Sequence, residues 1–64
     1  MTQKELLYLE DAICHEKNIV SICTETIEFL EDDALIDFMN KELKKHESME
    51  EKLIKLLKEK SNEW

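Results

Sequence analysis

The sequence predicts an all-α fold, an antiparallel two-helix hairpin, from three observations. The 64 residues contain no glycine and no proline, the residues that most often interrupt a helix. Hydrophobic residues recur at alternating steps of three and four in two long segments, which is the spacing of one helix face. An acidic cluster at residues 31–33 separates the segments and offers an N-cap for a second helix. We therefore expect helices at about 3–30 and 34–60, in one domain that spans residues 1–64.

The first helix is expected to begin near Gln3, because Thr2 and Glu5 have the spacing of a capping box. One seam of this helix is apolar at every position except Glu16, and it comprises Leu6, Leu9, Ile13, Glu16, Val20, Cys23, Ile27 and Leu30. A flanking strip widens the apolar arc to about 160° at 100° per residue, and it comprises Tyr8, Ala12, His15, Ile19, Ile22, Thr26 and Phe29. One partner helix cannot cover so wide an arc, so a second hairpin should pack there.

The second helix shows a similar seam with two polar interruptions, Glu42 and His46. The expected seam positions are Leu35, Met39, Glu42, His46, Met49, Leu53 and Leu56, with Ile36, Leu43 and Leu57 beside them. In an antiparallel hairpin that turns at residues 31–32, Glu16 lies opposite His46, with Glu42 and Glu50 one helical turn to either side. The polar interruptions of both helices therefore meet in one layer.

A chain of this size should be only marginally stable alone. It buries only about 60% of the surface that its unfolded form exposes, so we expect a homo-oligomer, with two hairpins forming a four-helix bundle. Ionised carboxylates inside such a bundle must be paired or must coordinate a metal. Two interpretations remain open. A Glu16–His46 hydrogen bond could fix the register, or Glu16, Glu42 and His46, with Glu50 as a further candidate, could hold iron or manganese.

Composition excludes several classes of function. Sixteen acidic residues against nine basic ones give a net charge of −7, which opposes nucleic-acid binding. No segment resembles a membrane span or a signal peptide, so the protein is expected to be cytoplasmic.

Cys14 and Cys23 are separated by about 13 Å of helix and should be free thiols, with Cys23 buried. His15 should be a half-exposed packing residue, and Trp64 should dock on a neighbouring subunit or be disordered. No set of nucleophile, base and orienting group is recognisable, so enzymatic activity stays undecided.

Two stretches, LEDAICHEKNIVSICTETI and LIDFMNKELKKHESMEEKL, together resemble the helical hairpin of the spore coat F family, a ferritin-like group in endospore-forming bacteria. The resemblance rests on Glu16-Lys17 in the first helix and on residues 40–43, Asn-Lys-Glu-Leu, in the second. It implies a ferritin-like four-helix bundle, a sporulating host, and association with the forespore or with spore coat proteins. His46 departs from the family pattern, so the resemblance does not supply the histidine ligand.

Two alternatives to a metal protein remain. Short helical hairpins also act as regulators of sporulation signalling, as phosphatases marked by Ser-x-x-x-Asp, but here Ser48 is followed by Lys52 at that spacing. A helical interaction module without metal needs only an exposed apolar strip.

Overall fold

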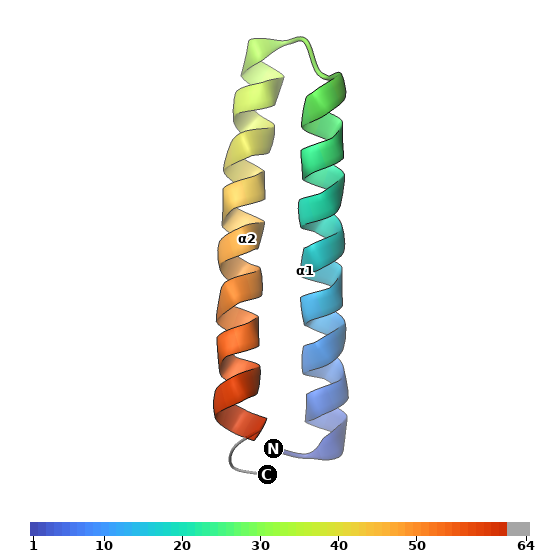
Figure 1. Cartoon of the computed structure of the whole chain (residues 1–64), viewed down its shortest axis with the longest axis vertical. Helices are drawn as coiled ribbons and strands as arrows, with labels where there is room; N and C mark the ends of the chain where they lie inside the picture. The colour runs from blue at the N-terminus through green and yellow to red at the C-terminus, as the bar shows by residue number, and fades with distance from the viewer. Residues whose placement is uncertain (62–64) are drawn as a thin grey trace.

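The computed structural model describes residues 1–61, which form an antiparallel hairpin of two α-helices. Helix α1 spans Gln3–Phe29 and helix α2 spans Asp33–Ser61, joined by the short loop at residues 30–32 (Figure 1). These bounds lie within one residue of those predicted from the sequence. Within the described residues the fold is all-helical, as expected.

The capping box predicted at the start of α1 is present. The Glu5 N–H donates to Thr2 Oγ1 at 3.0 Å, and the Thr2 N–H donates to Glu5 Oε1 at 2.8 Å. The carboxylate of Glu5 accepts a hydrogen bond from the Thr2 backbone N–H and a weaker one from the Thr2 hydroxyl, and these lower the pKa of Glu5 below its ordinary value of 4.5. Two of the unpaired backbone groups at the helix start are thereby satisfied locally.

The acidic cluster ends one helix and begins the next. The N–H of Leu30 donates to the Ile27 carbonyl at 3.3 Å as α1 ends. Asp32 then caps α2, because its Oδ1 accepts from the backbone N–H groups of Ala34 at 2.9 Å and Leu35 at 3.1 Å. Asp33 follows in the first turn of α2, where a negative charge complements the helix dipole.

The seam predicted for α1 is confirmed as the side that packs against α2. Each of its eight side chains is at least half-buried, and Ile13 and Cys23 are the most deeply buried of the described residues. Both cysteines are free thiols, Cys23 in this core and Cys14 exposed, as predicted. His15 is exposed rather than half-exposed, because it lies outside the seam and only one helix packs against α1.

The seam predicted for α2 is one residue too early at four positions: Leu35, Met49 and Leu56, which are exposed, and Glu42, which is half-buried beside the seam residue Leu43. Leu35, Met49 and Leu56 are 51%, 44% and 41% exposed, so Met49 is not core, in contrast to Met39. The half-buried seam of α2 follows the same steps of three and four but begins one residue later, at Ile36, Met39, Leu43, His46, Glu50, Leu53 and Leu57, with Glu42 and Ile54 half-buried beside it. Adjacent apolar pairs such as 35–36 and 56–57 are compatible with either seam. Packing against α1 selects the seam that begins one residue later.

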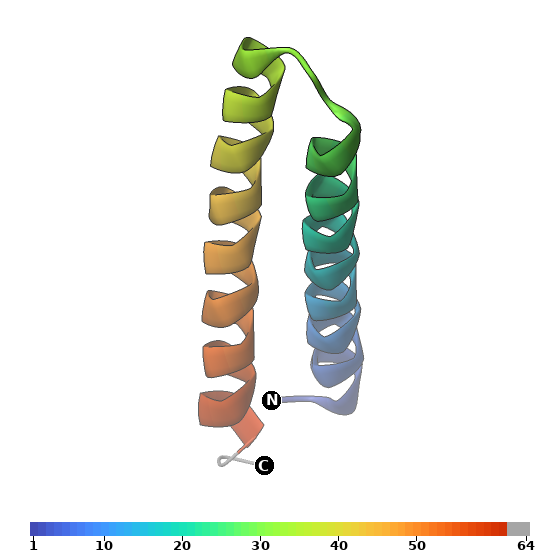
Figure 2. The same ribbon diagram turned by 45° about the horizontal axis from the view of Figure 1, so that its top comes forward.

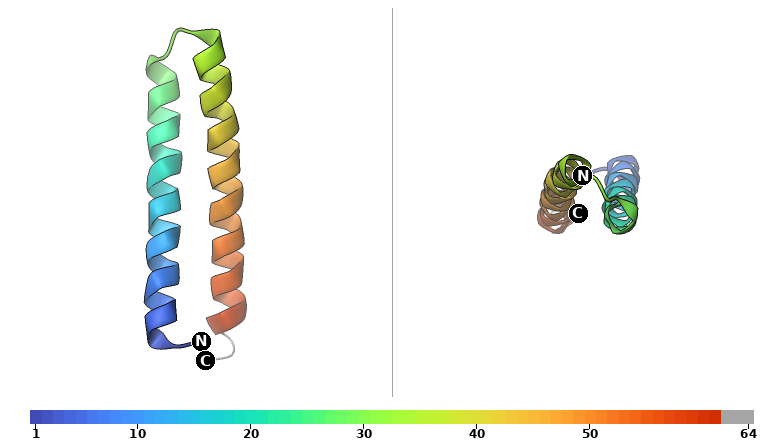
Figure 3. Two further views of the ribbon diagram at one scale, coloured as in Figure 1. Left: turned by 180° about the vertical axis from the view of Figure 1, so that it is seen from behind. Right: turned by 90° about the horizontal axis from the view of Figure 1, so that it is seen from above.

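The hairpin is a single layer of two helices. Its principal extents are 48 × 14 × 11 Å, and its radius of gyration is 14.8 Å, against about 11 Å for a globular domain of this length. The helices stay side by side when the molecule is tilted and when it is viewed from its end (Figures 2 and 3). Each helix therefore packs on one side only, and both broad faces of the layer are uncovered.

Candidate functional site

The polar layer predicted from the sequence is present halfway along the hairpin. Glu16, from the middle of α1, and His46, from the middle of α2, meet with 2.6 Å between Glu16 Oε2 and His46 Nδ1. Their side chains are 16% and 25% exposed, so most of this contact is shielded from water. The predicted register of the two helices is thereby confirmed.

This contact fixes the orientation of the imidazole ring. A carboxylate oxygen can only accept, so when Glu16 is ionised the proton of the hydrogen bond is carried by Nδ1. The other ring nitrogen, Nε2, then points away from α1, towards Glu42, whose Oε2 lies 3.6 Å away. That distance is too long for a hydrogen bond but short enough for an ion pair with a protonated ring.

Glu42 reaches the ring because it precedes His46 by four residues and so lies on the same side of α2. Its side chain is 33% exposed, more than that of Glu16, because residue 42 lies one position before the seam residue Leu43. Glu50 is half-buried on the seam one turn further along α2. The carboxylates of this layer therefore differ in exposure. Of the two that flank the imidazole ring, Glu16 is less exposed than Glu42.

The three residues predicted as metal ligands come together, but they do not surround a single point. Glu16 contacts Nδ1 and Glu42 lies beside Nε2, and these nitrogens face away from one another across the ring. Among residues 1–61, no group of three or more His, Cys, Asp or Glu side chains is placed to hold a metal ion. One chain therefore offers at most two ligands to one ion, Nε2 of His46 and the carboxylate of Glu42, with Glu16 orienting the ring from behind.

A second feature is the distribution of exposed apolar side chains. Among residues 1–61 the structure exposes eight large hydrophobic residues, and seven of them directly precede a seam position. We call these seven the apolar face: Tyr8, Ile22, Phe29, Leu35, Phe38, Met49 and Leu56, with exposed fractions from 41% to 84%. The eighth, Leu7, instead follows the seam residue Leu6.

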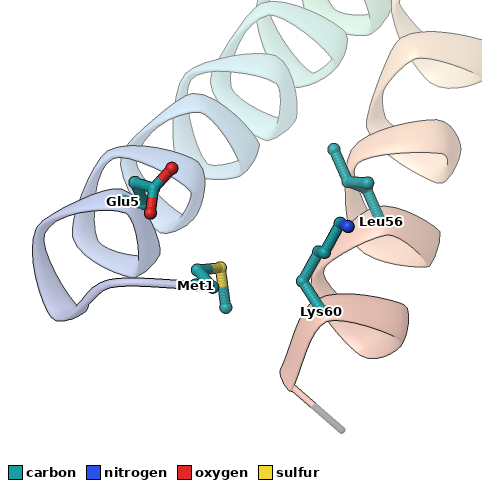
Figure 4. Close-up of a pocket in the computed structure, with 4 residues that line it drawn as sticks. All are labelled: Met1, Glu5, Leu56 and Lys60. Carbon is teal, nitrogen blue, oxygen red and sulfur yellow. The ribbon is translucent and has the colours of Figure 1, made fainter. Parts of the chain in front are cut away.

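The seven residues of the apolar face lie on the same side of the hairpin. A step of one residue backwards turns a side chain by 100° about the helix axis. Because α1 and α2 are both right-handed and run in opposite directions, that step turns both sets of side chains towards one broad face. The hollow at the open end supports this geometry, because Glu5 and Leu56, which both precede seam positions, line it together with Met1 and Lys60 (Figure 4).

Sequence reasoning found most of the apolar face but missed Phe38. Tyr8, Ile22 and Phe29 belong to the strip predicted beside the α1 seam and are exposed in the hairpin, whereas Ala12, Ile19 and Thr26 of the same strip are half-buried. Leu35, Met49 and Leu56 were assigned to the α2 seam instead. Phe38 directly precedes the seam residue Met39, as Phe29 precedes Leu30, so a flanking strip on the second helix like the one on the first would include it.

Other predicted features give no further site. Trp64 lies outside the described residues. Ser48 and Lys52 are both exposed, so the position where the phosphatase pattern has an aspartate carries a solvent-facing lysine. Neither α1 nor α2 combines the length and the apolarity that crossing a membrane requires.

The Glu16–His46 layer and the apolar face are therefore the two features from which a function can be argued. No known protein family, curated protein or solved structure matches this chain.

Proposed function

We propose that this protein is a helical interaction module that associates with a second copy of itself through the apolar face, forming a four-helix bundle. The observation that carries the proposal is that, of the eight large hydrophobic side chains exposed in the described part of the chain, seven gather on one side of a single-layer hairpin. Fully burying such a side chain contributes about 1.5–3 kcal/mol. A concentration of large exposed apolar side chains on one side of a molecule is typical of an interaction site.

The area of the hairpin supports the same proposal. Its accessible surface is 5116 Å², whereas a globular protein of this mass exposes about 4,300 Å². The excess, about 800 Å², matches the share that each partner buries in a standard protein interface. A second hairpin laid on the apolar face would bring the surface per chain into the normal range.

In this proposal the Glu16–His46 layer sets the register of the assembly. Glu16 and His46 already contact one another between α1 and α2, and a second pair of helices would shield this contact further from water. Sliding the two hairpins past one another would place apolar side chains over the Glu16–His46 pair and Glu42, which costs free energy because polar groups lose water without gaining partners. A buried polar contact of this kind trades stability for a unique arrangement.

The apolar face is tested by Ile22→Glu, with Leu7→Glu as its matched control. Both residues lie on α1 with similar exposed fractions, 59% and 55%, but only Ile22 belongs to the apolar face. Two Ile22 side chains enter each dimer, so Ile22→Glu should raise the dimer dissociation constant at least about 100-fold. Sedimentation equilibrium at micromolar concentration measures this directly. A monomeric wild-type protein, or equal weakening by both substitutions, would refute the proposal.

A second candidate function is the binding of iron or manganese within the dimer. The observation that favours it is the position of the Glu42 carboxylate beside Nε2 of His46 while Glu16 holds Nδ1, an arrangement typical of histidine ligands oriented by a carboxylate. Hard carboxylate oxygens with imidazole nitrogen suit these ions. Because one chain supplies two ligands, the remainder of the set must come from the second copy.

The metal hypothesis is tested by loading the purified protein anaerobically with ferrous or manganous ion, removing free ion and measuring the metal content. Stoichiometric metal and a raised melting temperature are expected, both lost in Glu42→Gln. Glu47→Gln is the control, because Glu47 is exposed and on α2 but away from the ring. No retained metal in the wild-type dimer would leave the interaction module as the function.

The biological setting rests on the resemblance to the spore coat F family. We propose a structural or accessory role in spores for the assembled module, on the basis of residues 16–17 and 40–43. A fluorescent fusion followed through sporulation of the host tests this. A signal that stays evenly spread through the mother cell and forespore would contradict it.

A further inference from the structure

The two ends of the hairpin carry opposite charge. From residue 24 to residue 40 the chain has six acidic side chains and no basic one, all exposed and gathered at the turn end: Glu25, Glu28, Glu31, Asp32, Asp33 and Asp37. One of these, Asp37, pairs with Lys41 at 3.2 Å just below the turn end. The open end, residues 1–10 and 52–61, carries five exposed lysines against three glutamates: Lys4, Lys52, Lys55, Lys58 and Lys60 against Glu5, Glu10 and Glu59.

We propose that the two copies associate end for end, with the acidic turn of each hairpin beside the basic open end of the other. This inference rests on the proposed self-association and specifies its geometry. Stacking two apolar faces with two-fold symmetry and full overlap allows only two arrangements. Either both turns lie at the same end, or one hairpin is reversed relative to the other.

The charge distribution separates these two arrangements. With both turns at one end, twelve acidic side chains crowd together with no basic residue between positions 24 and 40 of either chain. Reversal instead places six acids of one chain beside a segment with two net positive charges in the other. Packed helices lie about 8–10 Å apart, comparable with the screening length of about 8 Å at physiological ionic strength. The repulsion in the same-end arrangement is therefore only partly screened.

The position of the polar layer makes reversal possible without a mismatch. Glu16 is central in Gln3–Phe29, and His46 lies one residue from the centre of Asp33–Ser61. A two-fold axis through this layer therefore superposes Glu16 and His46 of one copy on the same layer of the other while the helices overlap over their full length. A layer nearer to one end would face apolar side chains after reversal.

Reversal also keeps two kinds of apolar pair in contact across the interface. It lays α1 over α1 of the second copy and α2 over its α2. Phe38 lies eight residues before His46 and Leu56 ten residues after it, so Phe38 of one chain meets Leu56 of the other. By the same count around Glu16, Ile22 meets Tyr8. These apolar contacts are thus kept while the acidic clusters are separated, and Phe29, thirteen residues after Glu16, lies opposite Gln3.

The test is a distance between two spin labels at the turn. Glu31→Cys in a Cys14→Ser background gives one exposed thiol per chain, because Cys23 is buried. Helices of this length are about 40 Å long, so electron-spin measurements should give a label separation of about 40 Å or more in the reversed dimer. The same-end dimer would bring the labels within about 20 Å, two helix diameters.

The control is a label on the native Cys14, which is exposed and lies close in height to the layer. Its separation is nearly the same in both arrangements, so it establishes that the labelled chains are dimeric. A dimer with a short distance between labels at residue 31 would overturn the end-for-end geometry and leave self-association intact. A monomer mass by light scattering of the unlabelled protein would instead refute the proposed function itself.

Discussion

Replacement of Glu16 and His46, singly and together, is the sharpest test of the central layer. The two side chains meet at 2.6 Å and are 16% and 25% exposed, so each single substitution leaves a partly buried polar group without its partner. Glu16→Leu and His46→Leu should each cost about 1–3 kcal/mol of unfolding free energy. The double substitution removes both polar groups together and should cost much less than the sum of the two.

The expected coupling between the two sites is about 1–2 kcal/mol. Urea unfolding followed by circular dichroism measures it, at one fixed protein concentration because the stability of a dimer depends on concentration. The double variant should also lose its unique register, visible as several label distances instead of one. If the cost of the double substitution equals the sum of the two single costs to within about 0.3 kcal/mol, the contact contributes no interaction energy and the reasoning is refuted.

Three further predictions concern the helix ends. Thr2→Ala removes the N-cap of α1 and should lower the unfolding free energy by about 1 kcal/mol in the same urea assay. The pKa of Glu5 is lowered in the folded chain, so its stabilising effect is complete above its ordinary value of 4.5 and is lost as the pH falls through the lowered folded value. Glu5→Gln keeps a cap but should abolish this part of the acid sensitivity, and identical acid titrations of the two proteins would contradict the assignment. Asp32→Ala removes both hydrogen bonds to the start of α2 and should cost about 1 kcal/mol, whereas Glu31→Ala, two residues before α2, should cost little.

The helices and their ends were predictable because their causes are local. A hydroxyl at residue 2 and a carboxyl at residue 5 satisfy one another's backbone groups whatever the rest of the chain does. The acidic turn behaves in the same way, although the sequence did not say which of its three acids would be the cap. Asp32 fills that role because its side chain reaches two amides of the first turn.

The two seams show where local pattern stops being sufficient. In α1 the apolar residues define one phase, and every predicted position is at least half-buried. In α2 the adjacent pairs 35–36 and 56–57 support two seams with equal apolar content, which share Met39, His46 and Leu53 and differ by one residue elsewhere. Only packing against α1 decides between them, and it turns Leu35, Met49 and Leu56 outwards to join the apolar face.

The amino-acid sequence by itself determined that the chain forms two helices, where they begin and end, and that Glu16 and His46 meet. Those features follow from residue spacing and from hydrogen bonds between near neighbours. The tertiary structure decided which nitrogen of His46 each carboxylate faces and which apolar side chains remain uncovered. Both depend on how far each helix rotates about its own axis, and that rotation is set by the fit of one helix against the other.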